Sequence, residues 1–276
     1  LQRLRSAGRV AELATLAAEQ KLSGNIGIAH TRWATHGAPS ERNAHPHVSN
    51  GIAVVHNGII ENHDAIRGRL QAAGYQFTSD TDTEVIAHLI HAKRKESGDL
   101  FAATRAAAAE LQGAYAIAVL SEDEPHRVVV ARMGAPLLLG VGEDGNFAAS
   151  DATALLQVTH KMIYLEEGDV VDLASDRFEI RDASGKKIER PVLVSELTAD
   201  AVDLGPYRHF MQKEIFEQPG AVANTLEMIT NAQSISPQLF GAEAAAILRQ
   251  VDSVLILACG TSYHAGVVAR YWIEAI

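Results

Sequence analysis

The chain has 276 residues, of which 47% are hydrophobic and 21% charged, and a formal net charge of −10 at pH 7. These values fit a globular protein of one large or two smaller domains, and the acidic balance argues against a nucleic-acid binder, which needs basic side chains to neutralise phosphates. A single cysteine excludes an internal disulfide framework and fits a reducing cytosol, and no apolar run approaches the length of a membrane span.

Both ends of the sequence indicate a piece of a longer chain. The sequence opens at Leu1 rather than at a methionine, and its charged start lacks the apolar stretch of a signal peptide. It stops at Ile276, inside a segment with helical character. We therefore expect a fragment of a larger protein.

The first third of the chain alternates expected helices with short apolar strands. Apolar residues at helical spacing predict a helix over 10–19, and apolar runs predict strands over 26–31 and 52–55. The first strand ends just before Arg32, and the second ends just before His56-Asn57-Gly58. Three further helices are expected: one from a cap at Asn62 to Ala73, one opened by a capping box at Thr81 to Glu84 and running through Ile90, and one over 100–111.

The middle of the chain, after Gly113, has the pattern of successive strands joined by turns. Strands are expected over 114–120, 127–132, 136–141, 146–149, 162–165, 169–173 and 177–180, with a short helix over 151–158. Hairpin-linked strands mixed with helices predict an α+β fold in layers rather than a regular βαβ alternation.

The last part of the chain follows a lapse in the regular pattern around 191–206. Helices are expected over 207–217, where Pro219 should end the helix, over 221–229 and over 242–249. The apolar run 254–258 predicts a buried strand, which leads through Cys259-Gly260-Thr261-Ser262 into a helix over 264–274. A strand, a turn of small residues and a helix are typical of the first unit of a doubly wound α/β domain.

Arg32 is the first candidate site residue. Its planar fork of donors, placed just after a strand, suits bidentate capture of a carboxylate, and the alternative is a surface ion pair. Trp33 is interpreted either as a core residue or as a hydrophobic lid, and Thr35 and His36 add hydrogen-bond donors beside it.

Asn57, Gly58 and Asp82 complete the expected site. The Asn57 amide and the Gly58 N–H suit an oxyanion hole, although Asn-Gly is also a common hairpin turn. Asp82 can pair with an ammonium group, or it can be an acid favoured by the helix dipole. A guanidinium, oxyanion donors and a carboxylate are together what is needed to hold a zwitterionic amino acid and to stabilise an oxyanion beside it.

The histidines and the cysteine give weaker signals. The histidines at the start of the chain are His30, His36, His45, His47, His56 and His63. Their spacing matches no zinc-site pattern, so we expect no metal. Cys259 is interpreted as a small residue at a tight turn rather than a reactive thiol, and Thr261 and Ser262 at a helix N-terminus suit a phosphate group.

Several stretches resemble the glutaminase domain of the glutamine–fructose-6-phosphate aminotransferase family. They are Gly27 to Gly37, Asn43 to His47, Val54 to Asn62, Thr81 to Ala87, Phe147 to Asp151 and Leu165 to Asp169. The segment 207–215 resembles the one that joins glutaminase to isomerase in that family, and 258–263 resembles the opening of its sugar-isomerase (SIS) domain. Other class II amidotransferases share the first set, but not the last two segments.

The resemblance implies an N-terminal nucleophile fold, a four-layer αββα sandwich, followed by the start of an α/β SIS domain. It places a glutaminase domain, truncated at its N-terminus, over 1–195 and a joining segment over 196–240. The beginning of the SIS domain, truncated at its C-terminus, would cover 241–276.

The resemblance also implies a role for each candidate residue. Arg32 would hold the glutamine carboxylate, Asp82 would hold the ammonium group, and Asn57 with Gly58 would form the oxyanion hole. The remaining assignments are passage of ammonia gated by Trp33, glutamine contacts from Thr35 and His36, and sugar-phosphate contacts from Thr261 and Ser262.

The function implied is that of an enzyme converting fructose 6-phosphate and L-glutamine to glucosamine 6-phosphate and L-glutamate. The parent would be a cytoplasmic homodimer without a cofactor, and without a nucleic-acid or membrane partner. The family uses an N-terminal cysteine as nucleophile, which this chain lacks, so we expect the fragment itself to be inactive. Two alternatives stay open: another class II amidotransferase, or a non-catalytic module that binds glutamine or a sugar phosphate.

Overall fold

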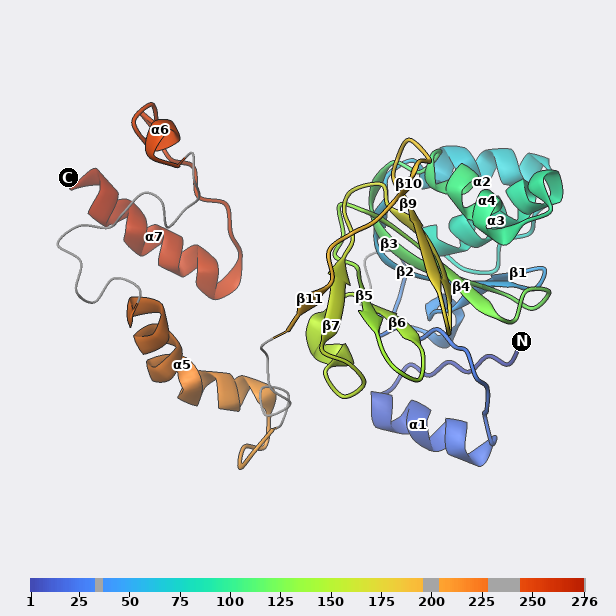
Figure 1. Ribbon diagram of the computed structural model, residues 1–276, viewed down its shortest axis with the longest axis horizontal. Coiled ribbons are helices and arrows are strands. Elements are labelled where there is room, and N and C mark those ends of the chain that lie inside the picture. The colour runs from blue at the N-terminus through green and yellow to red at the C-terminus, as the bar shows by residue number, and fades with distance from the viewer. Residues whose placement is uncertain (33–36, 196–203, 228–243, 276) are drawn as a thin grey trace. The chain divides into compact units, whose positions relative to one another are not determined.

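The structure is a computed structural model that describes residues 1–32, 37–195, 204–227 and 244–275 (Figure 1). The chain divides into two compact units, Leu1–Asp203 and Leu204–Ile276. The predicted domain limits at 195 and 240 are finer than this division and stay predictions.

The first unit contains most of the regular elements. Its helices are α1 (Val10–Glu19), α2 (His63–Ala72), α3 (Asp82–Ser97) and α4 (Leu100–Ala108), with the 3₁₀ helices η1 (Glu41–Asn43) and η2 (Ala152–Leu155). Its strands are β1 (His47–Ser49), β2 (Ile52–Ile60), β3 (Gly113–Ser121), β4 (Arg127–Met133), β5 (Leu138–Val141), β6 (Asn146–Ala149), β7 (Lys161–Tyr164), β8 (Val170–Ala174), β9 (Phe178–Arg181), β10 (Lys187–Ile188) and β11 (Leu193–Val194).

The strands form two sheets. One has seven strands in the order β1-β2-β3-β4-β8-β9-β10, and the other has four in the order β11-β7-β5-β6. Neighbouring strands in both sheets run antiparallel, for example with Asn57 opposite Ala116 and Gly58 opposite Tyr115. The predicted α+β class is confirmed.

The layers follow from the alternation of side chains along each strand. On β3, Ile117 and Val119 face a core shared with α2, α3 and α4, whereas Ala116 and Leu120 face a core shared with the small sheet. Helices α2, α3 and α4 therefore cover one face of the large sheet, and the small sheet covers the opposite face (Figure 1). On the other side of the small sheet, η2 contributes Leu155 to a third cluster.

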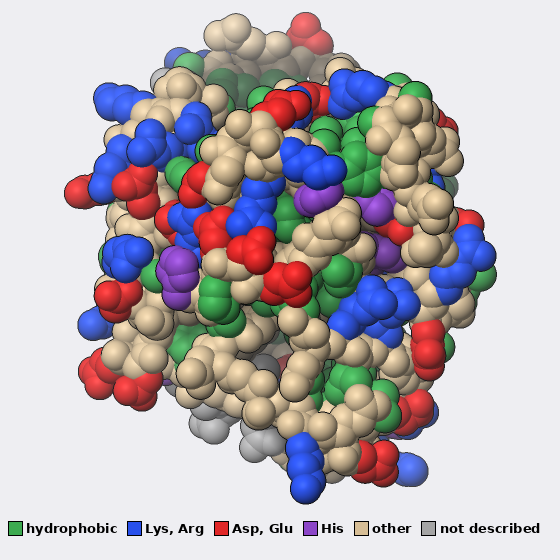
Figure 2. Space-filling model, turned by 90° about the vertical axis from the view of Figure 1, so that its right-hand side faces the viewer, with side chains coloured by type: hydrophobic (Ala, Val, Ile, Leu, Met, Phe, Trp, Pro, Cys, Tyr) green, Lys and Arg blue, Asp and Glu red, His purple; other side chains and the backbone are tan. Residues whose placement is uncertain are grey.

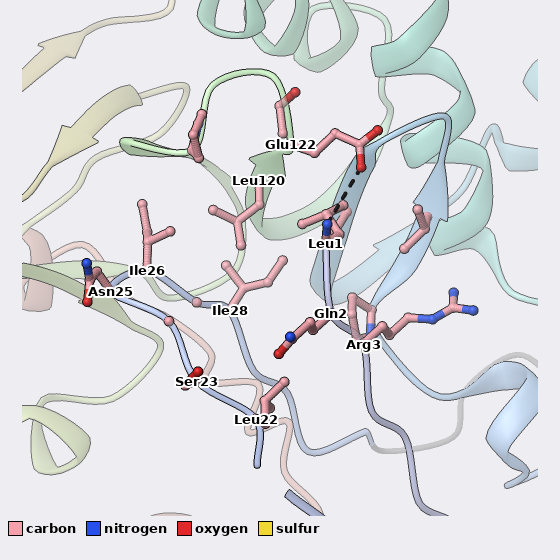
Figure 3. A pocket seen from close by; sticks show the side chains of 17 residues that line it. Leu1, Gln2, Arg3, Leu22, Ser23, Asn25, Ile26, Ile28, Leu120 and Glu122 are labelled. Carbon is pink, nitrogen blue, oxygen red and sulfur yellow. Dashed lines mark ion pairs between the residues drawn. The ribbon is translucent and has the colours of Figure 1, made fainter. Parts of the chain in front are cut away.

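The predicted strand over 26–31 does not form. Ile26 and Ile28 are half-buried and pack against the core between the sheets, but the segment belongs to neither sheet. They line a cavity of about 590 Å³ together with Leu120 (Figure 3). A strand needs a neighbour to pair its backbone groups, and the described residues provide none for this segment.

The strand predicted over 52–55 is longer than expected. β2 continues to Ile60, so Asn57 and Gly58 lie within a paired strand and not in a loop after it. The hairpin turn is instead at Asn50-Gly51, between β1 and β2, where both residues have positive φ (43° and 78°) as a type I′ turn requires.

The second unit contains α5 (Phe210–Glu227), α6 (Ala244–Leu248) and α7 (Gly260–Glu274). Pro219 lies inside α5 and does not end a helix at 217 as predicted. The expected strand over 254–258 is absent, and Leu255 and Leu257 are each 83% exposed. A lone apolar run cannot form a strand without a partner, and none is present among the described residues of this unit.

Neither a membrane-spanning helix nor a surface patch of one charge sign is found where the structure describes the chain and Figure 2 shows its face. Within the described ranges no helix is long and apolar enough to cross a membrane. Figure 2 shows acidic and basic side chains interspersed over that face.

Candidate active site

A cavity of about 310 Å³ in the first unit brings four of the predicted site residues together. The four are Arg32, Asn57, Gly58 and Asp82, which come from three separate parts of the chain. His30, Thr31, His45, His56, Ile59 and Thr83 complete the lining. Among the described residues, the larger cavity of Figure 3 contains no predicted site residue.

Asn57 and Gly58 are held by the pairing of β2 with β3. Asn57 is exposed, whereas its neighbour His56 is buried, because successive side chains of a strand point to opposite faces. Gly58 has φ of +136°, and a Cβ there would lie 2.0 Å from the Ala114 carbonyl oxygen. Only glycine therefore fits this position without displacing β3.

Asp82 is the first residue of α3 and is only 4% exposed. Its Oδ2 accepts a hydrogen bond of 2.9 Å from the Ile60 N–H, which fixes the carboxylate against β2. A negative charge is favourable at a helix N-terminus. Both interpretations of Asp82, the helix acid and the cavity anion, are thus compatible with its position.

The capping box predicted at Thr81 to Glu84 is half formed. The Thr81 hydroxyl accepts from the Glu84 N–H, as predicted. The Glu84 carboxylate does not return to Thr81; it accepts from the N–H and hydroxyl groups of Thr78 and Ser79. Burial alone would raise the pKa of Glu84, but these hydrogen bonds outweigh it and the pKa lies below its usual value.

Asn62 lies at the predicted start of a helix but does not cap it through its side chain. Asn62 occupies the N-cap position of α2, but its side chain makes no capping hydrogen bond. It bonds to the Glu110 carbonyl and the Gln112 N–H instead. The residue therefore ties α2 to the segment before β3.

Arg32 is half-buried at the edge of the cavity. Its guanidinium donates to the carbonyls of Gly37 (3.2 Å) and Ala38 (3.3 Å). A guanidinium carries five N–H donors, so contacts to two carbonyls are compatible with a bidentate contact to a carboxylate ligand.

Three neighbouring histidines have lowered pKa values; His30 and His45 line the cavity, and the His47 ring packs edge-on against His45. Burial lowers the pKa of His45 to about 2, with a further contribution from His30. Burial likewise lowers the pKa of His30 and of His47 to about 4. His30 and His45 stack with ring centroids 4.4 Å apart, so a positive charge on either ring would be unfavourable.

The other predicted residues fall into two groups. Trp33, Thr35 and His36 lie outside the described residues. Thr261 and Ser262 are exposed in the first turn of α7, and the exposed Cys259 is the N-cap of that helix in the second unit. No group of three metal-ligating side chains is placed to hold a metal ion in the ranges that the structure covers.

The sequence reasoning missed the roles of His45, His56 and Thr83 as lining residues. His56 and Thr83 are the immediate neighbours of Asn57 and Asp82, and this adjacency was the available signal. His45 has no such signal, because its place depends on the fold of the segment before β1.

The chain is similar to known proteins along its whole length. Residues 30–157 match the glutamine amidotransferase domain. All of the chain aligns with glutamine–fructose-6-phosphate aminotransferase (isomerizing) from Bordetella pertussis, at 57% identity, and from Acidithiobacillus ferridurans, at 58% identity. The chain spans 45% of the length of each of these relatives.

A solved structure of glutamine phosphoribosylpyrophosphate amidotransferase from B. subtilis is 27% identical with a TM-score of 0.48, over 57% of this chain and 35% of that one. The sequence matches to the aminotransferases cover the chain completely. The chain therefore carries a glutamine amidotransferase domain and is homologous along its whole length to the glutamine–fructose-6-phosphate aminotransferases.

Proposed function

We propose that this chain forms part of an enzyme that transfers the amide nitrogen of L-glutamine to fructose 6-phosphate, giving glucosamine 6-phosphate and L-glutamate. The observation that carries the proposal is the cavity that gathers a guanidinium, an Asn-Gly pair and a buried carboxylate. The names of the full-length relatives supply the acceptor sugar.

In the proposed enzyme each of these groups has a separate task. Arg32 binds the α-carboxylate of glutamine, and Asp82 binds its α-ammonium group, so that the amino acid is held at both charged ends. The Asn57 amide and the Gly58 N–H stabilise the oxyanion that forms on the side-chain carbonyl carbon. Rigid pairing of β2 with β3 keeps these donors in place before glutamine arrives.

The remaining assignments belong to the same proposal. Trp33 controls the passage of ammonia, Thr35 and His36 contact glutamine, and Thr261 and Ser262 contact the sugar phosphate. The intact enzyme would act on these small molecules as a cytoplasmic homodimer, without a nucleic-acid or membrane partner. The net charge of −10 and the single cysteine support that setting.

Replacement of Arg32 tests the binding half of the proposal. Loss of a buried charged contact costs about 2–5 kcal/mol, so Arg32→Ala in the intact enzyme should raise the KM for glutamine at least about 30-fold. Activity with free ammonia should change less. Arg177→Ala is the control, because Arg177 pairs with the adjacent Asp176 on an exposed turn. An unchanged KM for glutamine would refute the assignment of Arg32.

Replacement of Asn57 tests the chemical half. An oxyanion donor acts mainly in the transition state, so Asn57→Ala should lower kcat for glutamine hydrolysis about 10²–10³-fold with a small change in KM. Steady-state kinetics of glutamate release separate the two constants. If only KM rises, Asn57 contributes to ground-state binding and the oxyanion role is wrong.

A further inference from the structure

Thr83 connects two buried histidines beside the cavity. It follows Asp82 in the first turn of α3 and is only 1% exposed. Its Oγ1 lies 3.1 Å from His45 Nε2 and 3.1 Å from His56 Nδ1. One hydroxyl group thus joins β2, α3 and the segment before β1.

The number of protons limits how these three groups can bond. A hydroxyl carries one hydrogen and two lone pairs, so at least one of the two ring nitrogens must donate to Thr83 Oγ1. His45 Nδ1 is buried without a hydrogen-bond partner within the described ranges. A buried N–H without an acceptor is costly, so the ring hydrogen of neutral His45 belongs on Nε2, where it donates to Thr83.

With His45 as a donor, Thr83 Oγ1 keeps its hydrogen and one lone pair for the hydrogen bond with His56 Nδ1, which lies 3.1 Å away. His56 precedes Asn57 on β2 and its ring is buried on the face toward α3. On the other side of Asn57-Gly58, Asp82 Oδ2 accepts a hydrogen bond from the Ile60 N–H. The first turn of α3 therefore makes hydrogen bonds to β2 both before and after the proposed oxyanion donors.

We infer that Thr83 is a positioning residue for Asn57 and Gly58, acting through His56. The inference rests on the proposed function, since it concerns the same site. Thr83 holds neither charged end of the amino acid, because Arg32 and Asp82 have that task. Its loss should therefore disturb the transition state more than glutamine binding.

The test replaces the hydroxyl while keeping the shape of the side chain. In the intact enzyme, Thr83→Val should lower kcat for glutamine hydrolysis roughly tenfold to a hundredfold, because small displacements of catalytic groups have effects of that size. KM should change less than about threefold, since Arg32 and Asp82 are untouched. Thr83→Ser keeps the hydroxyl and should retain most of the activity.

Thr104→Val is the matched control. Thr104 is also a fully buried helical threonine, but its hydroxyl donates to the Leu100 carbonyl within α4. It should leave both constants unchanged. An unchanged kcat in Thr83→Val, or an equal loss in Thr104→Val, overturns the inference and leaves the proposed function standing. A wild-type enzyme that does not hydrolyse glutamine refutes the proposed function itself.

Ring ¹⁵N spectra of the chain 1–276, recorded for the wild type and for both valine variants, test the proton positions without turnover. Neutral His45 should carry its hydrogen on Nε2, and the His56 ring signals should shift in Thr83→Val but not in Thr104→Val. A hydrogen on His45 Nδ1, or an unchanged His56 ring in Thr83→Val, overturns the inference.

Discussion

Gly58 shows how one residue joins the stability of the fold to the proposed chemistry. Its φ of +136° is unfavourable for any residue with a side chain, and a Cβ would also come 2.8 Å from the Ala114 carbonyl carbon. A substitution here must therefore push β2 away from β3 at the point where the Asn57 and Gly58 donors are presented.

Gly58→Ala should lower the free energy of unfolding by at least about 2 kcal/mol, through backbone strain and the clash with β3. Gly68→Ala is the matched control, since Gly68 lies in α2 and an added methyl group there would meet open space. That change should stabilise the chain by roughly 0.5–1 kcal/mol. Urea unfolding of both variants measures the difference, and equal stabilities would contradict the strain argument.

At the residue scale, the sequence predicts which side chains meet in the cavity better than it predicts local conformation. Arg32, Asn57, Gly58 and Asp82 are recognisable because few functions need those groups together. By composition alone the dipeptide Asn57-Gly58 suggests a hairpin turn, because Asn-Gly is common in such turns. The true turn is Asn50-Gly51, and only the pairing of nine residues of β2 with β3 distinguishes the two.

At the scale of elements, the contact between the 45–49 segment and the first turn of α3 supports the site. Thr81 Oγ1 lies 3.1 Å from His47 Nε2, and Thr83 Oγ1 lies the same distance from His45 Nε2. Both histidines are buried and have lowered pKa values. Protonation of either ring would place a charge where it is poorly solvated, so this contact should weaken in acid.

The chain should lose stability as the pH falls below about 6.5. The folded pKa values of about 2 for His45 and about 4 for His30 and His47 lie below the ordinary value of 6.5. Between these values the unfolded chain binds protons that the folded chain does not. Each such histidine can therefore lower the free energy of unfolding by up to about 1.4 kcal/mol for each pH unit. Urea unfolding from pH 7.5 to pH 5 measures the slope.

Two variants test whether the buried histidines cause this dependence of the unfolding free energy on pH. His45→Gln should flatten the dependence between about pH 6.5 and pH 5, because it removes one titrating ring. His160→Gln, at an exposed position just before β7, should leave the slope as it is. A stability that is constant over this range in the wild type would contradict the neutral state of these rings.

Elements with their own local signals are predicted well, and elements that depend on a neighbour are not. Helix α1 has the predicted bounds, and α3 begins at its predicted Thr81 cap. The segments 26–31 and 254–258 have strand composition, but a strand also needs a partner for its backbone hydrogen bonds. The partner of Glu84 is likewise a matter of tertiary structure, because Thr78 and Ser79 precede the helix.

At the scale of the whole molecule, the buried apolar side chains are concentrated in the first unit. Apart from Ala244, every buried apolar side chain in the described part of the chain belongs to Leu1–Asp203. The second unit exposes large apolar residues along α5 and α7, including Phe216 (63%) and Trp272 (70%). The cooperative stability of the described chain should therefore reside in the first unit.

The chain 1–203 should consequently unfold like the chain 1–276. The slope of the unfolding free energy against urea scales with the surface exposed on unfolding, so both midpoint and slope of the main transition should agree between the two chains. Chain 1–169 is the control: it lacks β8, which lies between β4 and β9, and it should not fold. If instead the main transition of 1–203 has a clearly smaller slope than that of 1–276, the second unit unfolds together with the first. The apolar surfaces of α5 and α7 would then be buried in the cooperative core, against the exposure on which this prediction is based.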